Sequence, residues 1–348
     1  MLRSLSLLLH LLFFLDLPPS SLSTSPPEPD QHLHITYYYP AFSSGGYSSE
    51  GTAFAASLYG LSQAAGSNFT VGVVHHGDSY DGDYVGSLDG SARSLLSALT
   101  RASPPAKTTR HVTVCHSEPG AWNVDGGPRY STSLCPPASP PLSSPSVVHA
   151  TVGRTMFETD RLPDGWALRL NSLDEVWVPT EFSRGVFKAA GVTNLRVLGE
   201  GVDHDFFRPS PPLLVPPLFP SAPFLSVFKW EERKGWRVLL AAFLAEFEAE
   251  PLVSLVILTA GYHQNDSAIR DNLDEYLLSN GHAYAVSVVP LRLPTATLAT
   301  HVYTSPTLPT ITLLTGVPQP SLPSLYSSAA ALVLPSRGEG WGRPHMER

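Results

Sequence analysis

The sequence predicts an α/β protein of two domains, and two observations lead to this prediction. Segments typical of strands alternate with segments typical of helices along most of the 348 residues, a pattern that indicates mostly parallel sheets covered on both faces. Residues 207–223 carry so many prolines that neither a helix nor a strand can run through them. We therefore expect an N-terminal domain over residues 33–206, this Pro-rich linker, and a C-terminal domain over residues 224–348.

The composition excludes several classes of protein. Hydrophobic residues make up 43% of the chain, which is enough for a sizeable core. The formal net charge is -8, from 22 Lys and Arg against 30 Asp and Glu. No basic surplus is left to neutralise a phosphate backbone, so nucleic acid is not an expected partner.

The first residues resemble a targeting segment. A charged start at residues 1–3 precedes an apolar run at residues 5–17, which is shorter than the ~20 residues that a membrane-spanning helix needs. We expect residues 1–23 to be a signal peptide or a short hydrophobic leader. The protein would then lie in the lumen of the endoplasmic reticulum or Golgi, or be secreted, with membrane proximity as a further expectation.

The chain has two cysteines, Cys115 and Cys135. In an oxidising lumen they can form one disulfide, whose loop would contain the flexible Gly126-Gly127 pair. The alternative is two unpaired thiols, one of them in a buried strand. Two cysteines at this spacing cannot build a metal site.

The first domain begins with the β-branched and aromatic segment His34–Tyr39, which predicts a strand. A Gly-rich turn follows it. Thr180 and Gly191 are typical of a helix N-cap and of a C-terminal stop. The remaining elements expected in this domain are helices over 53–61, 91–102, 166–173 and 180–190, and strands over 71–75, 111–115, 147–152, 175–178 and 195–198.

The second domain repeats the alternation of strands and helices. Its expected elements are strands over 224–228, 252–258, 284–289, 311–314 and 330–334, and helices over 236–248, 269–278 and 322–328. Two such halves predict two doubly wound domains that face a cleft.

A glycine-bearing loop with two glutamates, Pro335–Glu347, directly follows the last expected strand. Backbone N–H groups of such a loop and of a helix N-terminus can approach a diphosphate, and carboxylates accept hydrogen bonds from sugar hydroxyls. The loop resembles the E-x7-E motif of retaining GT-B glycosyltransferases of the family-4 type, which have two Rossmann-like domains. The resemblance implies that Glu339 contacts the donor sugar and Glu347 the nucleotide ribose, and that the donor is also held by Gly338, Gly340 and Gly342.

A cationic loop ends the first strand of the second domain, at Phe228–Gly235. In the family that it resembles, an Arg and a Lys at such a loop hold the donor diphosphate. The matching positions here are Lys229 and Lys234. Lysine in place of arginine at position 229 keeps the charge but loses the bidentate fork.

Three features of the first domain also resemble this family. Glu158 follows a core strand, where the family places a polar residue that faces the sugar; the alternative is a surface ion pair between Arg154 and Glu158. The turn with Gly45 and Gly46 matches the family's glycine loop beneath the donor phosphates. His116 lies just beyond the carboxyl end of an expected strand, where ligands of α/β proteins bind, and is a candidate catalytic residue; the alternative is a structural histidine.

Some acidic residues invite a metal-site interpretation. Asp81-Gly82-Asp83 forms a D-x-D sequence, and His75, His76 and Asp78 lie close by in the chain. A turn rich in Asp and Gly explains this segment better. We expect no metal and no cofactor, the donor substrate being a nucleotide-diphosphate sugar.

The resemblance implies a hexosyltransferase-like enzyme that transfers sugar with retention to a glycan, lipid or protein acceptor. The main alternative is a noncatalytic remnant that binds a nucleotide sugar or a glycan. A third possibility is a phosphorylase or epimerase of the same fold, which would share the sheet but not this combination of motifs. Family members continue past the second glutamate, whereas Glu347 is the penultimate residue here. We therefore expect a C-terminally truncated domain, a mobile Glu347 carboxylate, and poor solubility with little or no activity for the 348-residue chain.

Overall fold

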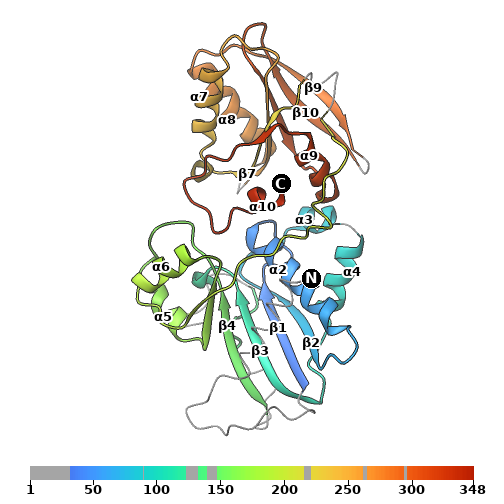
Figure 1. Cartoon of the computed structure of the whole chain (residues 1–348), viewed down its shortest axis with the longest axis vertical. Coiled ribbons are helices and arrows are strands. Elements are labelled where there is room, and N and C mark those ends of the chain that lie inside the picture. The colour runs from blue at the N-terminus through green and yellow to red at the C-terminus, as the bar shows by residue number, and fades with distance from the viewer. Residues whose placement is uncertain are drawn as a thin grey trace. The chain divides into compact units, whose positions relative to one another are not determined.

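The computed structural model describes residues 32–88, 90–122, 132–138, 147–214, 221–261, 265–293 and 296–348. The chain forms two compact units, and it passes from the first to the second between Gly201 and Val202 (Figure 1). The expected leader, residues 1–23, lies outside the described residues. In the part of the chain that is described, no helix is both long and apolar enough to cross a membrane.

The first unit is built on six parallel strands in the order β2-β1-β3-β4-β5-β6. The alternation of strands and helices predicted this parallel arrangement. The strands are β1 (His32–Tyr39), β2 (Phe69–His75), β3 (Thr108–His116), β4 (Val148–Arg154), β5 (Glu175–Val178) and β6 (Leu195–Val197). The helices are α2 (Gly46–Ser62), α3 (Gly82–Ser87), α4 (Gly90–Thr100), α5 (Trp166–Asn171) and α6 (Glu181–Ala189).

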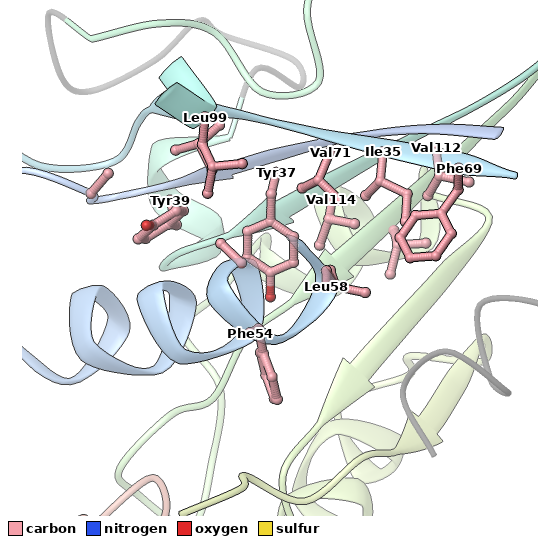
Figure 2. Close-up of a cluster of buried hydrophobic side chains, with 14 of the residues drawn as sticks. Ile35, Tyr37, Tyr39, Phe54, Leu58, Phe69, Val71, Leu99, Val112 and Val114 are labelled. Carbon is pink, nitrogen blue, oxygen red and sulfur yellow. The ribbon is translucent and has the colours of Figure 1, made fainter. Parts of the chain in front are cut away.

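Helices cover both faces of this first sheet. Phe54 and Leu58 of α2 pack with Ile35 and Tyr37 of β1 on one face, and Leu99 of α4 belongs to the same core (Figure 2). On the other face, side chains of α5 and α6 pack against β5. Successive strand residues point to opposite faces, so each strand supplies both cores.

The end signals of helix α6 act as the sequence predicts. The hydroxyl group of Thr180 accepts a hydrogen bond from the backbone N–H of Ser183 at 3.0 Å. Gly191 has a φ of +91°, a left-handed conformation that costs glycine little. A polar cap and a glycine stop therefore fix both ends of this helix.

The segment around Asp81 differs from its expected structure as a turn. Residues Gly82–Ser87 form helix α3, and the Asp81 carboxylate accepts a hydrogen bond from the backbone N–H of Tyr84 at 2.9 Å. The same Asp and Gly residues that favour turns also favour helix N-termini. Asp81 is thus a helix cap.

Cys115 and Cys135 are joined in a disulfide, so the alternative of two free thiols is wrong. Both cysteines are fully buried and belong to the core that contains Tyr38 and Trp122. The disulfide therefore links the end of strand β3 to the segment at residues 132–138.

The second unit contains a mixed sheet in the order β12-β7-β8-β11-β10-β9. The first four strands of this order are parallel, and β10 pairs antiparallel with both β11 and β9. The strands are β7 (Phe224–Trp230), β8 (Ser254–Gly261), β9 (Ala285–Arg292), β10 (Thr297–Thr304), β11 (Thr310–Thr315) and β12 (Ala331–Leu332). The helices are α7 (Trp236–Glu246), α8 (Asp266–Ser279), α9 (Leu322–Ser328) and α10 (Arg343–Glu347).

Helices also cover both faces of the second sheet. Helices α7 and α8 pack together over one face (Figure 1), and Leu325 and Tyr326 of α9 lie on the other face. The central strands are therefore buried on both sides, which is why β8 contains the continuous apolar run Leu255–Leu258.

Candidate functional site

The topology of the second sheet marks one place where a ligand is expected. After β7 the chain adds β8 on one side of it, and the last strand, β12, is placed on the other side. The position between β7 and β12 is therefore the topological switch point of the sheet. Ligands of open α/β sheets bind outside the carboxyl ends of the strands at such a switch point. The cationic loop follows β7, and the glycine-bearing loop follows β12.

Side chains of these two loops contact each other directly. The ammonium group of Lys234 donates to both carboxylate oxygens of Glu339, at 2.8 Å each. The guanidinium of Arg233 donates to the carbonyl oxygen of Gly338 and lies 3.9 Å from the Glu339 carboxylate. The structure therefore brings together two residues that the sequence assigned to the donor diphosphate and the donor sugar.

The backbones of the two loops also meet. The backbone N–H of Arg337 donates to the carbonyl oxygen of Arg233 at 2.9 Å. Gly235, with a φ of +72°, lies so close to the second loop that a Cβ atom would stand 2.3 Å from the carbonyl oxygen of Pro335. Only glycine permits this approach, so the pairing of the loops depends on position 235.

We predict that Gly235→Ala destabilises the second unit by more than about 1 kcal/mol, because the new methyl group must push the backbone at Pro335 away. Chemical denaturation measures the change. Gly281→Ala is the matched control, since Gly281 has a φ of +77° but nothing within 4 Å of its Cβ position. Equal losses of stability in both variants would show that the close contact with Pro335 does not contribute to the effect.

Glu347 is held by two neighbours. Its carboxylate accepts hydrogen bonds from the Tyr326 hydroxyl at 3.0 Å and from Arg343 Nε at 3.2 Å, and its side chain is 11% exposed. The expectation of a mobile carboxylate is therefore not met, because a buried tyrosine of α9 and an arginine one turn earlier in α10 both bind it. Burial raises the pKa of the Tyr326 hydroxyl above its ordinary value, and the neighbouring Glu347 adds to this effect.

The remaining donor-site candidates of the second unit lie at the end of β7 and in the loop after β12. Lys229 is the penultimate residue of β7 and is half-buried. Gly340 is buried, Gly338 is half-buried, and Gly342, with a φ of +79°, precedes helix α10. Their assignment to the donor stays a prediction.

A buried charged network lies at the carboxyl ends of β3 and β4 in the first unit. Arg154 donates through Nε to Glu50 Oε1 at 2.8 Å and through a terminal nitrogen to the carbonyl oxygen of Leu198. Glu50 Oε2 lies 3.0 Å from His116 Nε2, and His116 Nδ1 lies 3.0 Å from the Tyr37 hydroxyl. The Arg154–Glu158 surface pair considered above is wrong, since Arg154 is fully buried and bound to Glu50.

The network fixes the charges of its members. Burial by itself raises the pKa of Glu50, but the charge of Arg154 and then the contacts with His116 outweigh it and hold this pKa at about 2. Burial lowers the pKa of His116 below its ordinary value, although Glu50 opposes the shift. The network is therefore an arginine–glutamate ion pair beside a neutral histidine, and His116 is enclosed at 0% exposure.

Tyr47 connects the glycine loop of the first unit to the segment that follows β4. It comes directly after Gly45 and Gly46, and its hydroxyl donates to the carbonyl oxygen of Met156 at 2.8 Å. Its ring lies 5.6 Å from that of His116. Strands β1 and β3 also form a switch point, so Gly45, Gly46 and His116 lie at the expected ligand edge. Glu158, two residues beyond Met156, is half-buried.

Sequence reasoning missed Glu50 and Tyr47. Glu50 and Arg154 are 104 residues apart, and no spacing rule links them. The available signal was weak: a lone carboxylate in the Ala-rich and Leu-rich segment that became α2. Such a residue is seldom fully buried unless it is paired, so its partner had to be a buried cation.

Buried histidines make the stability of the first unit dependent on pH. Burial is the main cause that lowers the pKa of His34, His76 and His111 to about 4 each. Below pH 6.5 these histidines bind protons in the unfolded chain but stay neutral in the folded chain. The free energy of unfolding therefore falls as the pH drops from about 6.5 to 4.

We expect this loss to be on the order of a few kcal/mol, and a series of denaturation curves between pH 7.5 and 4 measures it. Replacing His111 with Asn should flatten the dependence, whereas replacing the exposed His204 with Gln should not. Stability that stays constant or rises on acidification would contradict the burial of neutral histidines.

The clustered acidic and histidine residues near Asp78 and Asp83 do not form a metal centre in the structure. Within the described ranges, no group of three or more His, Cys, Asp or Glu side chains is arranged to hold a metal ion. His76 is instead bound to the hydroxyl of Ser117 at 3.0 Å and to the carbonyl oxygen of Ser133 at 2.7 Å.

Comparisons with known proteins identify solved structures with a similar fold. No family model matches the chain, and no curated protein matches it. Among solved structures, HepE from Anabaena in complex with UDP and glucose is similar with a TM-score of 0.52 and 13% identity, over 91% of this chain and 78% of HepE. Sucrose-phosphate synthase from Thermosynechococcus elongatus gives a TM-score of 0.49 at 12% identity, over 91% of this chain and 78% of that one.

The similarity to HepE shows a shared fold. At 13% identity it shows nothing about substrate or reaction. It agrees with the two parallel-rich sheets, each covered by helices, that the two units contain. The chain has the GT-B fold.

Proposed function

We propose that this protein is a glycosyltransferase that takes a sugar from a nucleotide-diphosphate donor, with retention at the anomeric carbon. The observation that carries the proposal is the joining of the loops after β7 and β12 through Lys234 and Glu339. A cation for a leaving diphosphate and a carboxylate for sugar hydroxyls lie side by side at the switch point of the sheet.

Each residue has a role in this proposal. Lys229 and Lys234 neutralise the negative charge that develops on the departing diphosphate, and Glu339 accepts hydrogen bonds from the donor sugar. Glu347 binds the ribose. In the first unit, Glu158 orients a hydroxyl group of the donor or acceptor, and Gly45 and Gly46 allow a phosphate to approach the start of α2.

The comparison supports the proposal, since HepE has this fold and was crystallised with UDP and glucose. A glycan, lipid or protein acceptor fits the proposal equally, as does a place in the lumen of the secretory pathway. The second candidate is a protein that binds a nucleotide sugar without turnover. It is motivated by the pairing of Lys234 with Glu339, which neutralises the cation proposed for the diphosphate.

A donor assay separates these candidates. The 348-residue chain is incubated with a panel of nucleotide sugars, and released nucleoside diphosphate is measured with and without added glycan acceptors. Release that is lost in Lys234→Ala supports the transferase. Binding of a nucleotide sugar without release supports the noncatalytic candidate, and the absence of both contradicts the proposed function.

We predict that the reaction proceeds without a divalent metal, because the lysine side chains at the diphosphate loop supply the positive charge. Activity in EDTA should equal activity in buffer, and added manganese should change it less than about twofold, within ordinary assay scatter. Activity abolished by the chelator and restored by manganese would contradict this.

A further inference from the structure

Glu339 neutralises the cation that the proposed function needs for a diphosphate. The Lys234 ammonium nitrogen lies 2.8 Å from both carboxylate oxygens of Glu339. The side chains are 13% and 28% exposed, so water screens the pair only in part. A carboxylate bound through both oxygens occupies the place of two oxygens of a phosphate group.

The surrounding charges leave little free positive charge at this loop. Arg233, the other cation beside Glu339, binds the Glu231 carboxylate at 3.3 Å and the carbonyl oxygen of Gly338. Glu232 and Arg237 pair with each other at 3.1 Å. A diphosphate that binds Lys234 must therefore displace Glu339 from it, and the nearby Arg233 and Arg237 are themselves paired with carboxylates.

We propose that Glu339 is an exchangeable counter-ion of Lys234: it leaves the lysine when a nucleotide sugar binds and returns to it when the sugar has gone, which helps to expel the diphosphate product. This inference rests on the proposed function. While the sugar is present, its hydroxyl groups bind the displaced carboxylate. Once the sugar is transferred, the carboxylate returns to Lys234, its nearest cation, and competes with the diphosphate for it.

The test compares Glu339→Gln with the unaltered 348-residue chain, using UDP, GDP and ADP as probes in a calorimetric titration. Glutamine keeps the shape of the side chain and removes its charge, so the diphosphate should bind about 5- to 10-fold more tightly. The corresponding nucleotide sugars should gain less, since their sugar loses a charged acceptor. Glu232→Gln is the matched control: it removes a charge from the same loop but not from Lys234, and it should change the affinity less than about twofold.

A second variant keeps the experiment interpretable if Glu339→Gln does not fold properly. Glu339→Asp keeps the charge and withdraws it by one methylene group, so it should tighten binding by less than the glutamine variant does. Thermal unfolding of each variant checks its fold. If the unaltered chain binds a nucleoside diphosphate and neither variant binds it more tightly than Glu232→Gln does, the inference is wrong although the proposed function stands. If neither the chain nor any variant binds these probes or their sugars, the proposed function itself is wrong.

Discussion

Replacing Lys234 with alanine is expected to weaken nucleoside diphosphate binding by about 30- to 100-fold, the worth of a charge-assisted hydrogen bond in a partly enclosed site. The loss has two parts. The diphosphate loses the ammonium group, and the Glu339 carboxylate that this group neutralises at 2.8 Å is left to repel the ligand.

Arg233→Ala should weaken binding less, because the Arg233 guanidinium is bound to Gly338 and Glu231 within the loops. A titration of both variants with UDP, GDP and ADP makes the comparison. Lys188→Ala, at an exposed position of α6, controls for the change in net charge. Equal losses for Lys234→Ala and Arg233→Ala would contradict the assignment of the phosphate cation to Lys234.

The largest effect on stability is expected from Arg154→Met, which should lower the free energy of unfolding by about 3–5 kcal/mol. Methionine approximates the length of the side chain but leaves the Glu50 carboxylate, at 1% exposure, without its cation. It also leaves the carbonyl oxygen of Leu198 without the guanidinium donor. Urea denaturation of the unaltered chain and the variant measures the loss.

Two further variants sharpen this prediction. Adding Glu50→Leu to Arg154→Met should restore part of the lost stability, because no unpaired charge then remains in the core. Arg161→Met should leave the free energy of unfolding almost unchanged, since the Arg161–Asp160 pair is exposed to solvent. A loss of less than 1 kcal/mol in Arg154→Met would show that the buried pair does not hold the first unit together.

The sequence predicted most elements because their signals are local. Strand β5 begins and ends where expected, at Glu175–Val178, and the cap at Thr180 locates helix α6. Strand β10 was missed, since Thr297–Thr304 mixes threonines with a histidine and has no apolar run. Its partner β9 is an exposed edge strand, so burial imposes no clear pattern on either.

The candidate site was predictable only in part, for a similar reason. The loops after β7 and β12 carry glycines, cations and carboxylates in a short stretch of sequence, and the structure joins them. The network of Glu50, Arg154 and His116 combines residues from a helix and two strands. Such pairing depends on the packed fold, and the sequence shows its members only as isolated polar residues.

The central claim is that a nucleotide sugar binds at the carboxyl edge of the second sheet, between the loops after β7 and β12. Hydrogen exchange of the 348-residue chain, with and without the nucleotide sugar that binds best in the donor panel, tests it most directly. Binding should slow exchange of the backbone amides at residues 229–237 and 336–343, where the two loops meet, and Lys234→Ala should abolish this protection. Tight binding that leaves these amides unchanged and protects a different part of the chain would contradict the account.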